Sequence, residues 1–344
     1  MKVITIGAAT LDIFLQSQQF KTLKDPHFRF RAGFPLHTGL CFPLGEKIEL
    51  TNAYFSLGGG VLNAASTLAQ AGLTTTATFK LGRDLIGEQI LTLLRSAHFA
   101  KHFKLYQGQG NFSIIALSQE GERVIFVYRD QKTRWRSRQL PQATNGFFYI
   151  TPGDTSVQIW LKFFKQLKQK NNILACNPSA DFLAAKKELI KKAFAFLDVL
   201  LVNKEEAEKI LGQEDSDQAV CRSLQQIAPR TVIVVTLGER GVTVCSQGDM
   251  FYSPGFKAKK VADMTGAGDA FGSAFCGALV KNNFFNPPES ASTPQRSALL
   301  KEAIRWGCAN AVAVIEKLGA QAGILAEKDY QNLRFRKLRI EKLE

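Results

Sequence analysis

The chain has 344 residues, of which 45% are hydrophobic and 22% charged, a composition that excludes a disordered or fibrous protein. This length fits one large α/β domain or two smaller domains. Lysine and arginine exceed aspartate and glutamate by 44 to 30, and the formal charge of +14 favours an anionic partner: nucleic acid, a membrane surface or a phosphorylated small molecule.

The apolar runs and the cysteines narrow the possible partners and the expected cellular compartment. No apolar run approaches the roughly 18 residues of a membrane span, so we expect no membrane partner. The opening "MKVITIGAATLDIFL" is interrupted by Asp12 too early for a signal peptide. Most of the six cysteines stand in apolar runs such as "ILACN" and "SAFCGA", which is typical of buried free thiols. We therefore expect a cytoplasmic protein with reduced cysteines.

The N-terminal third mixes two kinds of pattern. "KVITIG" predicts a buried first strand, and residues 14–54 then mix Phe, Pro, Gly and Thr without a helical period. "KIELTNAYF" alternates apolar and polar residues, which predicts a strand with one wet face. "GGGVLNAASTLAQAG" predicts a glycine turn and a helix of small residues that stops at Gly72, and "TTTATFKLG" and "GEQILTLLRSAHFA" predict a strand and a helix.

A second β-rich patch precedes a long alternation of strands and helices. "NFSIIALSQEGERVIFVYRD" predicts two strands joined by the turn "SQEGER". From "GFFYIT" onward strands and helices alternate, which predicts a doubly wound, mostly parallel sheet with helices on both faces. We expect residues 1–13, 55–103 and 132–344 to form this core, residues 14–54 and 104–131 to form a small β lid, and the tail "RFRKLRIEKLE" to end as a solvated helix.

Residues 259–280, "KKVADMTGAGDAFGSAFCGALV", hold the most informative motif. A helix that starts after glycines presents unpaired N–H groups and a positive dipole end, which attract anions. Asp269 would hinder simple phosphate binding there, but it suits a base that takes the proton of a hydroxyl attacking a γ-phosphate. The structural alternative is an acidic first-turn residue stabilised by the helix dipole.

This motif and five others resemble the ribokinase-like (PfkB) family of carbohydrate kinases. "DMTGAGDAF" resembles the family's "DTxGAGD" element, with Met264 at a position where the family often has a small polar residue. The other elements follow the family's order across nearly the whole chain: "GGGVLNAASTLAQAG", "KLGRDLIGE", "VNKEEAE", "VTLGERG" and "EKLGAQAG". No GxxxxGK[ST] motif occurs, so the sequence offers no Walker-type nucleotide site.

The resemblance implies the phosphate chemistry of the site. Asp269 would be the catalytic base, with the backbone of Gly266, Ala267 and Gly268 as the anion hole. Asn203 and Glu206 would order water around Mg²⁺ near the triphosphate, although the pair would equally serve as a helix N-cap and its capping-box partner. ATP would lie along Thr236, Gly238 and Gly241, and Asn310 would either flank the adenine or be a buried helix residue with a backbone partner.

The resemblance also implies an acceptor site and a cation site. Asp12, Gly59 and Asn63 would hold sugar hydroxyls, and Arg129 on the lid would meet either an acidic substrate or a lid carboxylate. Asp263 and Thr265 would contribute to a site for K⁺.

Three functions from different classes compete. The first is an ATP-dependent kinase that phosphorylates a primary hydroxyl of a sugar, or of a nucleoside in the alternative. The second is a nucleic-acid binder, suggested by Trp135 among the basic residues of "YRDQKTRWRSRQL" but lacking a recognised fold motif. The third is a non-catalytic binding relative, which the intact motif disfavours. We also expect the lid edge to be able to pair with that of a second copy as a homodimer, because exposed strand edges need covering.

Overall fold

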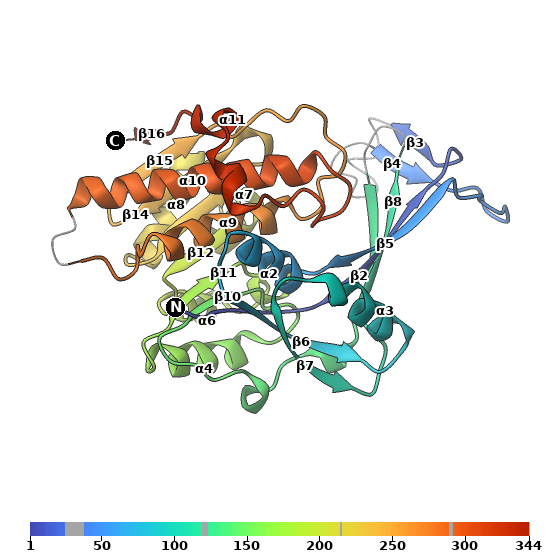
Figure 1. Ribbon diagram of the computed structural model, residues 1–344, viewed down its shortest axis with the longest axis horizontal. Coiled ribbons are helices and arrows are strands. Elements are labelled where there is room, and N and C mark those ends of the chain that lie inside the picture. Colours follow the sequence, from blue (N-terminus) through green and yellow to red (C-terminus); the bar gives the residue numbers. More distant parts are fainter. Residues whose placement is uncertain (25–37, 119–122, 214, 289–291, 344) are drawn as a thin grey trace.

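The computed structural model describes residues 1–24, 38–118, 123–213, 215–288 and 292–343 (Figure 1). Parts of the expected lid, at 25–37 and 119–122, lie outside the described residues, as does most of the expected turn "SQEGER".

A ten-stranded sheet crosses the larger part of the molecule. Its strands are β1 (Val3–Ile6), β6 (Thr75–Gly82), β7 (Ala100–Tyr106), β10 (Phe147–Ile150), β11 (Ile173–Cys176), β12 (Val199–Asn203), β13 (Val232–Thr236), β14 (Val242–Ser246), β15 (Asp249–Ser253) and β16 (Glu341–Leu343). They lie in the order β16-β15-β14-β13-β12-β11-β10-β1-β6-β7. Neighbours from β13 to β7 are parallel, and β14, β15 and β16 continue the sheet with antiparallel pairs.

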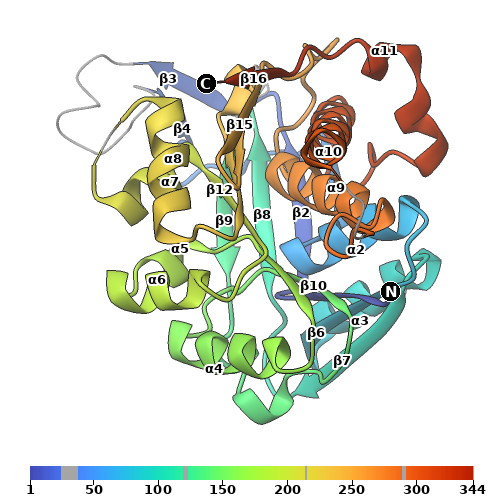
Figure 2. The same cartoon turned by 90° about the vertical axis from the view of Figure 1, so that its left-hand side faces the viewer.

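Helices cover both faces of this sheet (Figures 1 and 2). One face carries α2 (Gly60–Gln70), α9 (Ala267–Lys281) and α10 (Thr293–Ile315); the other carries α4 (Val157–Lys168), α6 (Lys187–Phe194), α7 (Lys204–Leu211) and α8 (Asp217–Ile227). The remaining helical segments are α3 (Leu85–Leu93), α5 (Ala180–Leu183), α11 (Leu333–Arg336) and the 3₁₀ turns η1 (Leu94–Ser96), η2 (Gln131–Thr133), η3 (Ser137–Gln139), η4 (Gly238–Arg240) and η5 (Glu327–Gln331).

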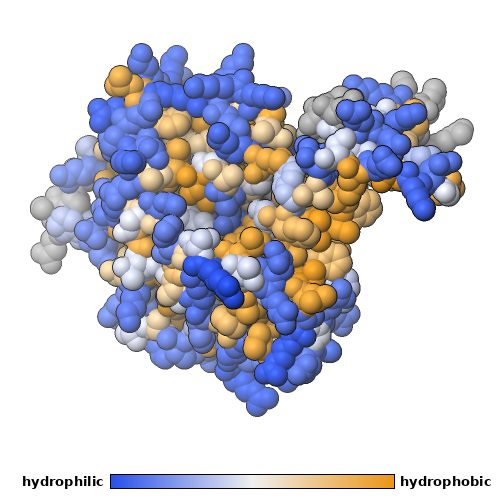
Figure 3. All heavy atoms as spheres, turned by 45° about the vertical axis from the view of Figure 1, so that its right-hand side comes forward, coloured by the Kyte–Doolittle hydropathy of each residue, from blue (hydrophilic) through white to orange (hydrophobic). Residues whose placement is uncertain are grey.

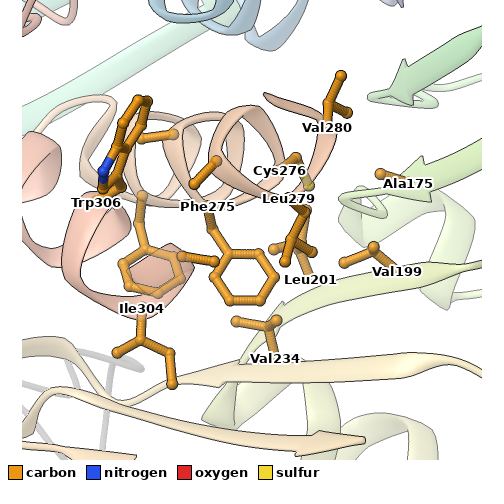
Figure 4. Packing of buried hydrophobic residues seen from close by; sticks show 14 of the residues in the cluster. Ala175, Val199, Leu201, Val234, Phe275, Cys276, Leu279, Val280, Ile304 and Trp306 are labelled. Carbon is orange, nitrogen blue, oxygen red and sulfur yellow. The ribbon is translucent and has the colours of Figure 1, made fainter. Parts of the chain in front are cut away.

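Successive residues of the central strands enter different hydrophobic clusters. Val3 packs beneath α2 and α9, whereas its neighbour Ile4 packs beneath α4. Figure 4 shows the first of these clusters, where Phe275 and Leu279 of α9 meet Leu201 and Val234 of the sheet. Because both faces are covered, these strands are almost continuously apolar, which explains the unbroken hydrophobic runs in the sequence.

A second, smaller sheet stands beside this core. It consists of β2 (Thr10–Gln16), β5 (Asn52–Gly58), β8 (Phe112–Leu117) and β9 (Arg123–Tyr128) in the order β5-β2-β8-β9. Strand β2 pairs in parallel with β8, and the outer pairs are antiparallel. The strands β3 (Lys21–Lys24) and β4 (Thr38–Cys41) form a separate hairpin that projects from the molecule (Figure 1). The chain passes from β1 into β2 at residues 7–9, so the small sheet begins directly beside the carboxyl end of the main sheet.

The doubly wound fold is confirmed, but the boundaries between the main sheet and the small sheet differ from those expected between core and lid. Residues 104–106 belong to β7 in the main sheet, while residues 10–13 and 55–58 belong to the small sheet. The C-terminal tail does not end as a helix, because after the short α11 its last described residues pair with β15 as β16. None of the helices in the described parts of the chain is both long and apolar enough to cross a bilayer.

Candidate active site

The N-terminus of α9 is the centre of the site. Gly266, its N-cap, has a φ of 78°, in the left-handed region that favours glycine. A Cβ built there would lie 2.5 Å from Cβ of Ala320, so a larger residue would also clash. The amides of the first helical turn lack intrahelical acceptors, and Gly268 has open space around it. The expected anion hole is therefore sterically accessible.

A pocket of about 260 Å³ opens in front of this helix terminus. It lies at the carboxyl ends of β12 and β13, where ligands of doubly wound sheets bind. Many of the residues expected in the nucleotide and phosphate site line it together: Asn203, Glu206, Thr236, Gly266, Gly268 and Asp269. Because these residues come from three separate stretches of sequence, their convergence supports one shared site.

The carboxylate of Asp269 lies in this pocket and is held by α2. Nδ2 of Asn63 donates a hydrogen bond to Oδ2 of Asp269 at 2.9 Å. Burial raises the pKa of Asp269, and the hydrogen bond from Asn63 opposes that rise. Helix α2 begins after Gly59, whose φ of 85° and close approach to the carbonyl of Ala8 admit only glycine. The expected acceptor and phosphate residues thus meet where α2 and α9 begin.

Asp12 is a second buried carboxylate. It lies on β2, is 5% exposed, and packs over Gly58, where a Cβ would lie 2.0 Å from its Oδ2. Burial, with the nearby charges of Asp263 and Asp269, raises the pKa of Asp12 to about 7, while a hydrogen bond from Ser113 opposes the rise. A buried carboxylate with so little solvation favours a polar ligand such as a hydroxyl.

Asn203 and Glu206 form the expected capping box, and both line the pocket. Oδ1 of Asn203 accepts from the backbone N–H of Glu206 at 2.8 Å, and Oε2 of Glu206 accepts from that of Asn203 at 2.9 Å. This capping box starts α7 and at the same time presents both side chains to the pocket. Burial raises the pKa of Glu206, and the hydrogen bond from Asn203 opposes this.

Asp263 and Thr265 lie together in the loop just before α9. Oδ1 of Asp263 accepts from N and Oγ1 of Thr265 at 2.9 and 2.6 Å, and its Oδ2 accepts from N of Gly319 at 3.1 Å. Within the described ranges no three His, Cys, Asp or Glu side chains gather as a metal cluster. Nor does Asp263, Asp12 or Asp269 form an ion pair with another described residue. The Asp263 carboxylate therefore has no basic partner among the described residues, and together with the Thr265 hydroxyl it supplies oxygen atoms of the kind that bind a cation.

The turn after β13 directly follows the pocket, but its glycines Gly238 and Gly241 are not among the residues that line it. Thr236 ends the strand and lines the pocket, and Gly238 follows with a φ of 64°. Gly241 has a φ of 99°, and a Cβ there would lie 1.9 Å from the carbonyl oxygen of Ser253. Gly241 therefore allows the chain to turn closely against the end of β15.

Two expected site residues have protein partners instead. Arg129, just after β9, lies 3.6 Å from the carboxylate of Asp181 on α5, so its partner belongs to the core rather than to the lid. Asn310 is fully buried in α10: its Nδ2 donates to Ala270 and Thr67, and its Oδ1 accepts from N of Leu325. These bonds use its amide, which favours the structural role over contact with an adenine.

Sequence reasoning missed Asn177 and Phe271, which line the pocket. Asn177 directly follows β11, and a polar residue at the carboxyl end of a predicted parallel strand was the available signal. Conversely Trp135, which suggested nucleic-acid stacking, is 3% exposed and packs in the core beneath α4.

A search against protein-family profiles matches residues 39–327 to the pfkB family of carbohydrate kinases. The chain belongs to this family. It is accordingly an ATP-dependent kinase with the ribokinase fold.

Individual pfkB relatives act on different acceptors. The chain is 24% identical over 334 residues to a ribokinase of Staphylococcus aureus, covering 94% of this chain and 96% of that one. It is 24% identical over 254 residues to an ATP-dependent 6-phosphofructokinase of Thermoanaerobacterium thermosaccharolyticum, covering 69% and 76%. The nucleoside kinase of Methanocaldococcus jannaschii superposes with a TM-score of 0.72 at 20% identity, covering 98% of both chains.

Proposed function

We propose that this pfkB kinase transfers the γ-phosphoryl group of ATP to a primary hydroxyl of a sugar, with Asp269 as general base. The proposal rests on the position of Asp269, whose carboxylate shares one pocket with the open amides at the start of α9. The acceptor oxygen forms a bond to the γ-phosphorus, the bond from that phosphorus to the departing ADP breaks, and the hydroxyl proton passes to Asp269.

The backbone of residues 266–268 carries the other half of this proposal. Negative charge spreads over the phosphoryl oxygens in the transition state, and fixed N–H dipoles stabilise it without reorganising. The raised pKa of Asp269 suits a base, since a more basic carboxylate accepts the hydroxyl proton more readily. Asn203, Thr236 and Gly238 would position the triphosphate from the ends of β12 and β13.

Glu206 is the proposed contact to Mg²⁺ through water. Its Oε2 is engaged with the backbone of Asn203, and carboxylate oxygens are the ligands that Mg²⁺ prefers. Bound with ATP, the ion would neutralise charge on the β- and γ-phosphates. A K⁺ ion beside Asp263 and Thr265 is part of the same proposal, because the Asp263 carboxylate has no basic partner among the described residues and lies against the Thr265 hydroxyl.

The small sheet is proposed to act as a lid over the acceptor. Asp12, Gly59 and Asn63 would hold sugar hydroxyls where the small sheet joins the core, and closure would exclude water as a competing acceptor. Arg129 would close the lid against Asp181 rather than bind an anionic sugar. A nucleoside is the second candidate acceptor, favoured by the full-length likeness to a nucleoside kinase.

Acceptor-dependent ADP release tests this proposal. Pentoses, hexoses, phosphosugars and nucleosides would be screened with ATP and Mg²⁺, and the product of any active acceptor examined by ³¹P NMR. We expect one acceptor class to yield a phosphate monoester with stoichiometric ADP. Release of ADP that no acceptor in these classes stimulates would overturn the proposed function.

A further inference from the structure

Three consecutive residues after α10 each contact a different part of the site. N of Gly319 donates to Asp263, and Ala320 packs against the position where Gly266 lacks a Cβ. Nε2 of Gln321 donates to Oδ1 of Asn63 at 3.1 Å, on the helix opposite α9. This loop therefore touches the expected cation site, the anion hole and the partner of the base in turn.

Gln321 belongs to a chain of hydrogen bonds that ends at Asp269. Oγ of Ser66 donates to Oε1 of Gln321 at 2.9 Å, Gln321 donates to Asn63, and Nδ2 of Asn63 donates to Asp269 at 2.9 Å. The Asp269 carboxylate at the end of this chain sets the direction of each hydrogen bond in it. An ionised carboxylate only accepts, so Asn63 must present its NH₂ to Asp269 and its carbonyl oxygen to Gln321, which must donate.

We propose that Gln321 is a positioning residue for the base: it holds the amide of Asn63 in the orientation that directs an N–H group at Asp269. This inference rests on the proposed function of Asp269. Without a donor at position 321, the Asn63 amide can rotate and turn its carbonyl oxygen toward the carboxylate. The base would then lose a hydrogen bond that also fixes its direction, while the amides of the anion hole would be unchanged.

The protonation of Asp269 should report this rotation. Its pKa is lowered by the Asn63 hydrogen bond, so losing that bond raises it further. The other titratable groups that interact with Asp269 are Asp12 on β2, Glu206 on α7 and the buried Tyr149 on β10. None of these is altered by a change at position 321.

Gln321→Glu is the sharpest test, because it keeps the shape of the side chain and removes the N–H donor. A carboxylate at this position prefers the NH₂ of Asn63 and so favours the rotated amide. We expect kcat at neutral pH to fall about 10- to 100-fold, the range typical of residues that orient an active-site ligand. We also expect the acidic limb of the kcat–pH profile to move to higher pH, while the KM for ATP changes less than twofold.

Gln70→Glu is the matched control. Gln70 and Gln321 line the same surface groove of about 240 Å³, so both substitutions place a new carboxylate in one environment. Gln70 has no place in the chain to Asp269, and its variant should keep the wild-type pH profile. Ser66→Ala removes only the outermost donor and should shift the profile in the same direction by a smaller amount.

A measurement that does not depend on catalysis tests the positioning role of Gln321 separately from the proposed kinase activity. The carboxyl carbon of Asp269 can be followed by ¹³C NMR in protein labelled at aspartate, with Asp269→Asn identifying the resonance. In the Gln321→Glu protein, its titration should move to higher pH than in wild type and in Gln70→Glu. If Gln321→Glu matches Gln70→Glu in both titration and pH profile, Gln321 is not a positioning residue, even where wild type is an active kinase.

Discussion

At the scale of single residues, the Asp269 carboxylate has two roles: it accepts a hydrogen bond from Asn63, and it is the proposed base. One substitution separates these roles. Asp269→Asn keeps the shape of the side chain and an oxygen that can accept from Asn63, but it removes the ability to take a hydroxyl proton. We expect kcat to fall by about 10²–10⁴-fold, the usual contribution of a general base, with little change in substrate affinity.

The same variant tests the structural alternative. A residue that only stabilises the start of α9 through the helix dipole would cost roughly 0.3–1 kcal/mol of stability and leave turnover nearly normal. Measurement of kcat together with the melting temperature distinguishes the two roles. Turnover within about fivefold of wild type would rule out the base, because such a loss is far below the range for general-base catalysis.

Glu206 offers a similar separation of roles. Glu206→Gln preserves the capping box, because glutamine can accept the same backbone hydrogen bond from Asn203. It removes the charge that would attract Mg²⁺. We expect a higher Mg²⁺ concentration for half-maximal activity, with unchanged thermal stability and acceptor KM. A Mg²⁺ titration identical to that of wild type would show that Glu206 serves only as a helix cap.

Asp12 should make stability depend on pH. Its folded-state pKa of about 7 lies above the value of about 3.9 for an unfolded chain, so the folded protein holds the proton more tightly. The stability from this group is fully present below pH ~4 and is lost as pH rises toward ~7, with a maximum slope of about 1.4 kcal/mol per pH unit.

Asp12→Asn should abolish that part of the slope. Urea denaturation at several pH values between about 4.5 and 7.5 should show the variant gaining stability relative to wild type as pH rises. If plots of unfolding free energy against pH are parallel for the variant and wild type, Asp12 titrates alike in the folded and unfolded states. Comparing the variant with wild type at each pH cancels the effect of the chain's overall positive charge.

At the scale of elements, the turn from β13 into β14 depends on one glycine. Gly241→Ala places a methyl group against the carbonyl oxygen of Ser253 at a φ of 99°. Gly248→Ala, in the next turn, has a similar φ of 91° but nothing within 4 Å. We expect Gly241→Ala to lower the free energy of unfolding by roughly 1–3 kcal/mol more than Gly248→Ala, because only the first adds a steric clash to backbone strain. If chemical denaturation shows that both variants lose the same free energy of unfolding, the contact between the new methyl group and the Ser253 carbonyl relaxes at little cost.

Elements with continuous apolar runs could be predicted from the sequence, and those that depend on distant partners could not. "TVIVVT" and "DVLLV" have to be buried on both faces, and they became β13 and β12. Residues 104–106 are expected in the lid from the sequence, yet they belong to β7 ("AKHFKLY"), whose residues are exposed or half-buried at the edge of the main sheet. The three residues of β16 carry no strand signal of their own and become a strand only because β15 offers an open edge.

The residues of the candidate site also fall into those that could be predicted from the sequence and those that could not. Asp269, Asn203 and Glu206 stand within short motifs whose local geometry explains their roles, so sequence alone could single them out. Gln321 contacts Asn63 at a sequence separation of 258 residues, and its pairing follows from the meeting of α2 with the loop after α10. Only the folded chain brings the two together.

At the scale of the whole molecule, the small sheet leaves apolar side chains in solvent. Figure 3 shows apolar surface gathered near the projecting hairpin, and the exposed large hydrophobic residues include Phe55 of β5 and, on β9, Ile125, Phe126, Val127 and Tyr128. Adjacent β9 residues point to opposite faces, so both faces of this edge strand are apolar. We propose a homodimer through the small sheet, because a second copy would cover the edge and these side chains.

Sedimentation velocity tests this assembly. The wild-type protein should sediment as a dimer at micromolar concentration, and Phe126→Asp should shift it to the monomer because a charge cannot be buried there without a partner. Leu333→Asp, at another exposed apolar position on α11, should leave the dimer intact. A wild-type protein that remains monomeric at these concentrations would contradict the proposed interface.

The strand order also has a consequence for synthesis on the ribosome. Strand β1 is made before β6 and β10 and lies between them, so one of its edges stays open until residues 147–150 have emerged. The small sheet likewise waits for β8 and β9, about 60 residues after β5. A nascent chain of intermediate length therefore carries apolar strands with unpaired edges, the state in which chains misassemble with one another. Translation that pauses before residue 147 should make this protein depend on chaperones that cover such edges.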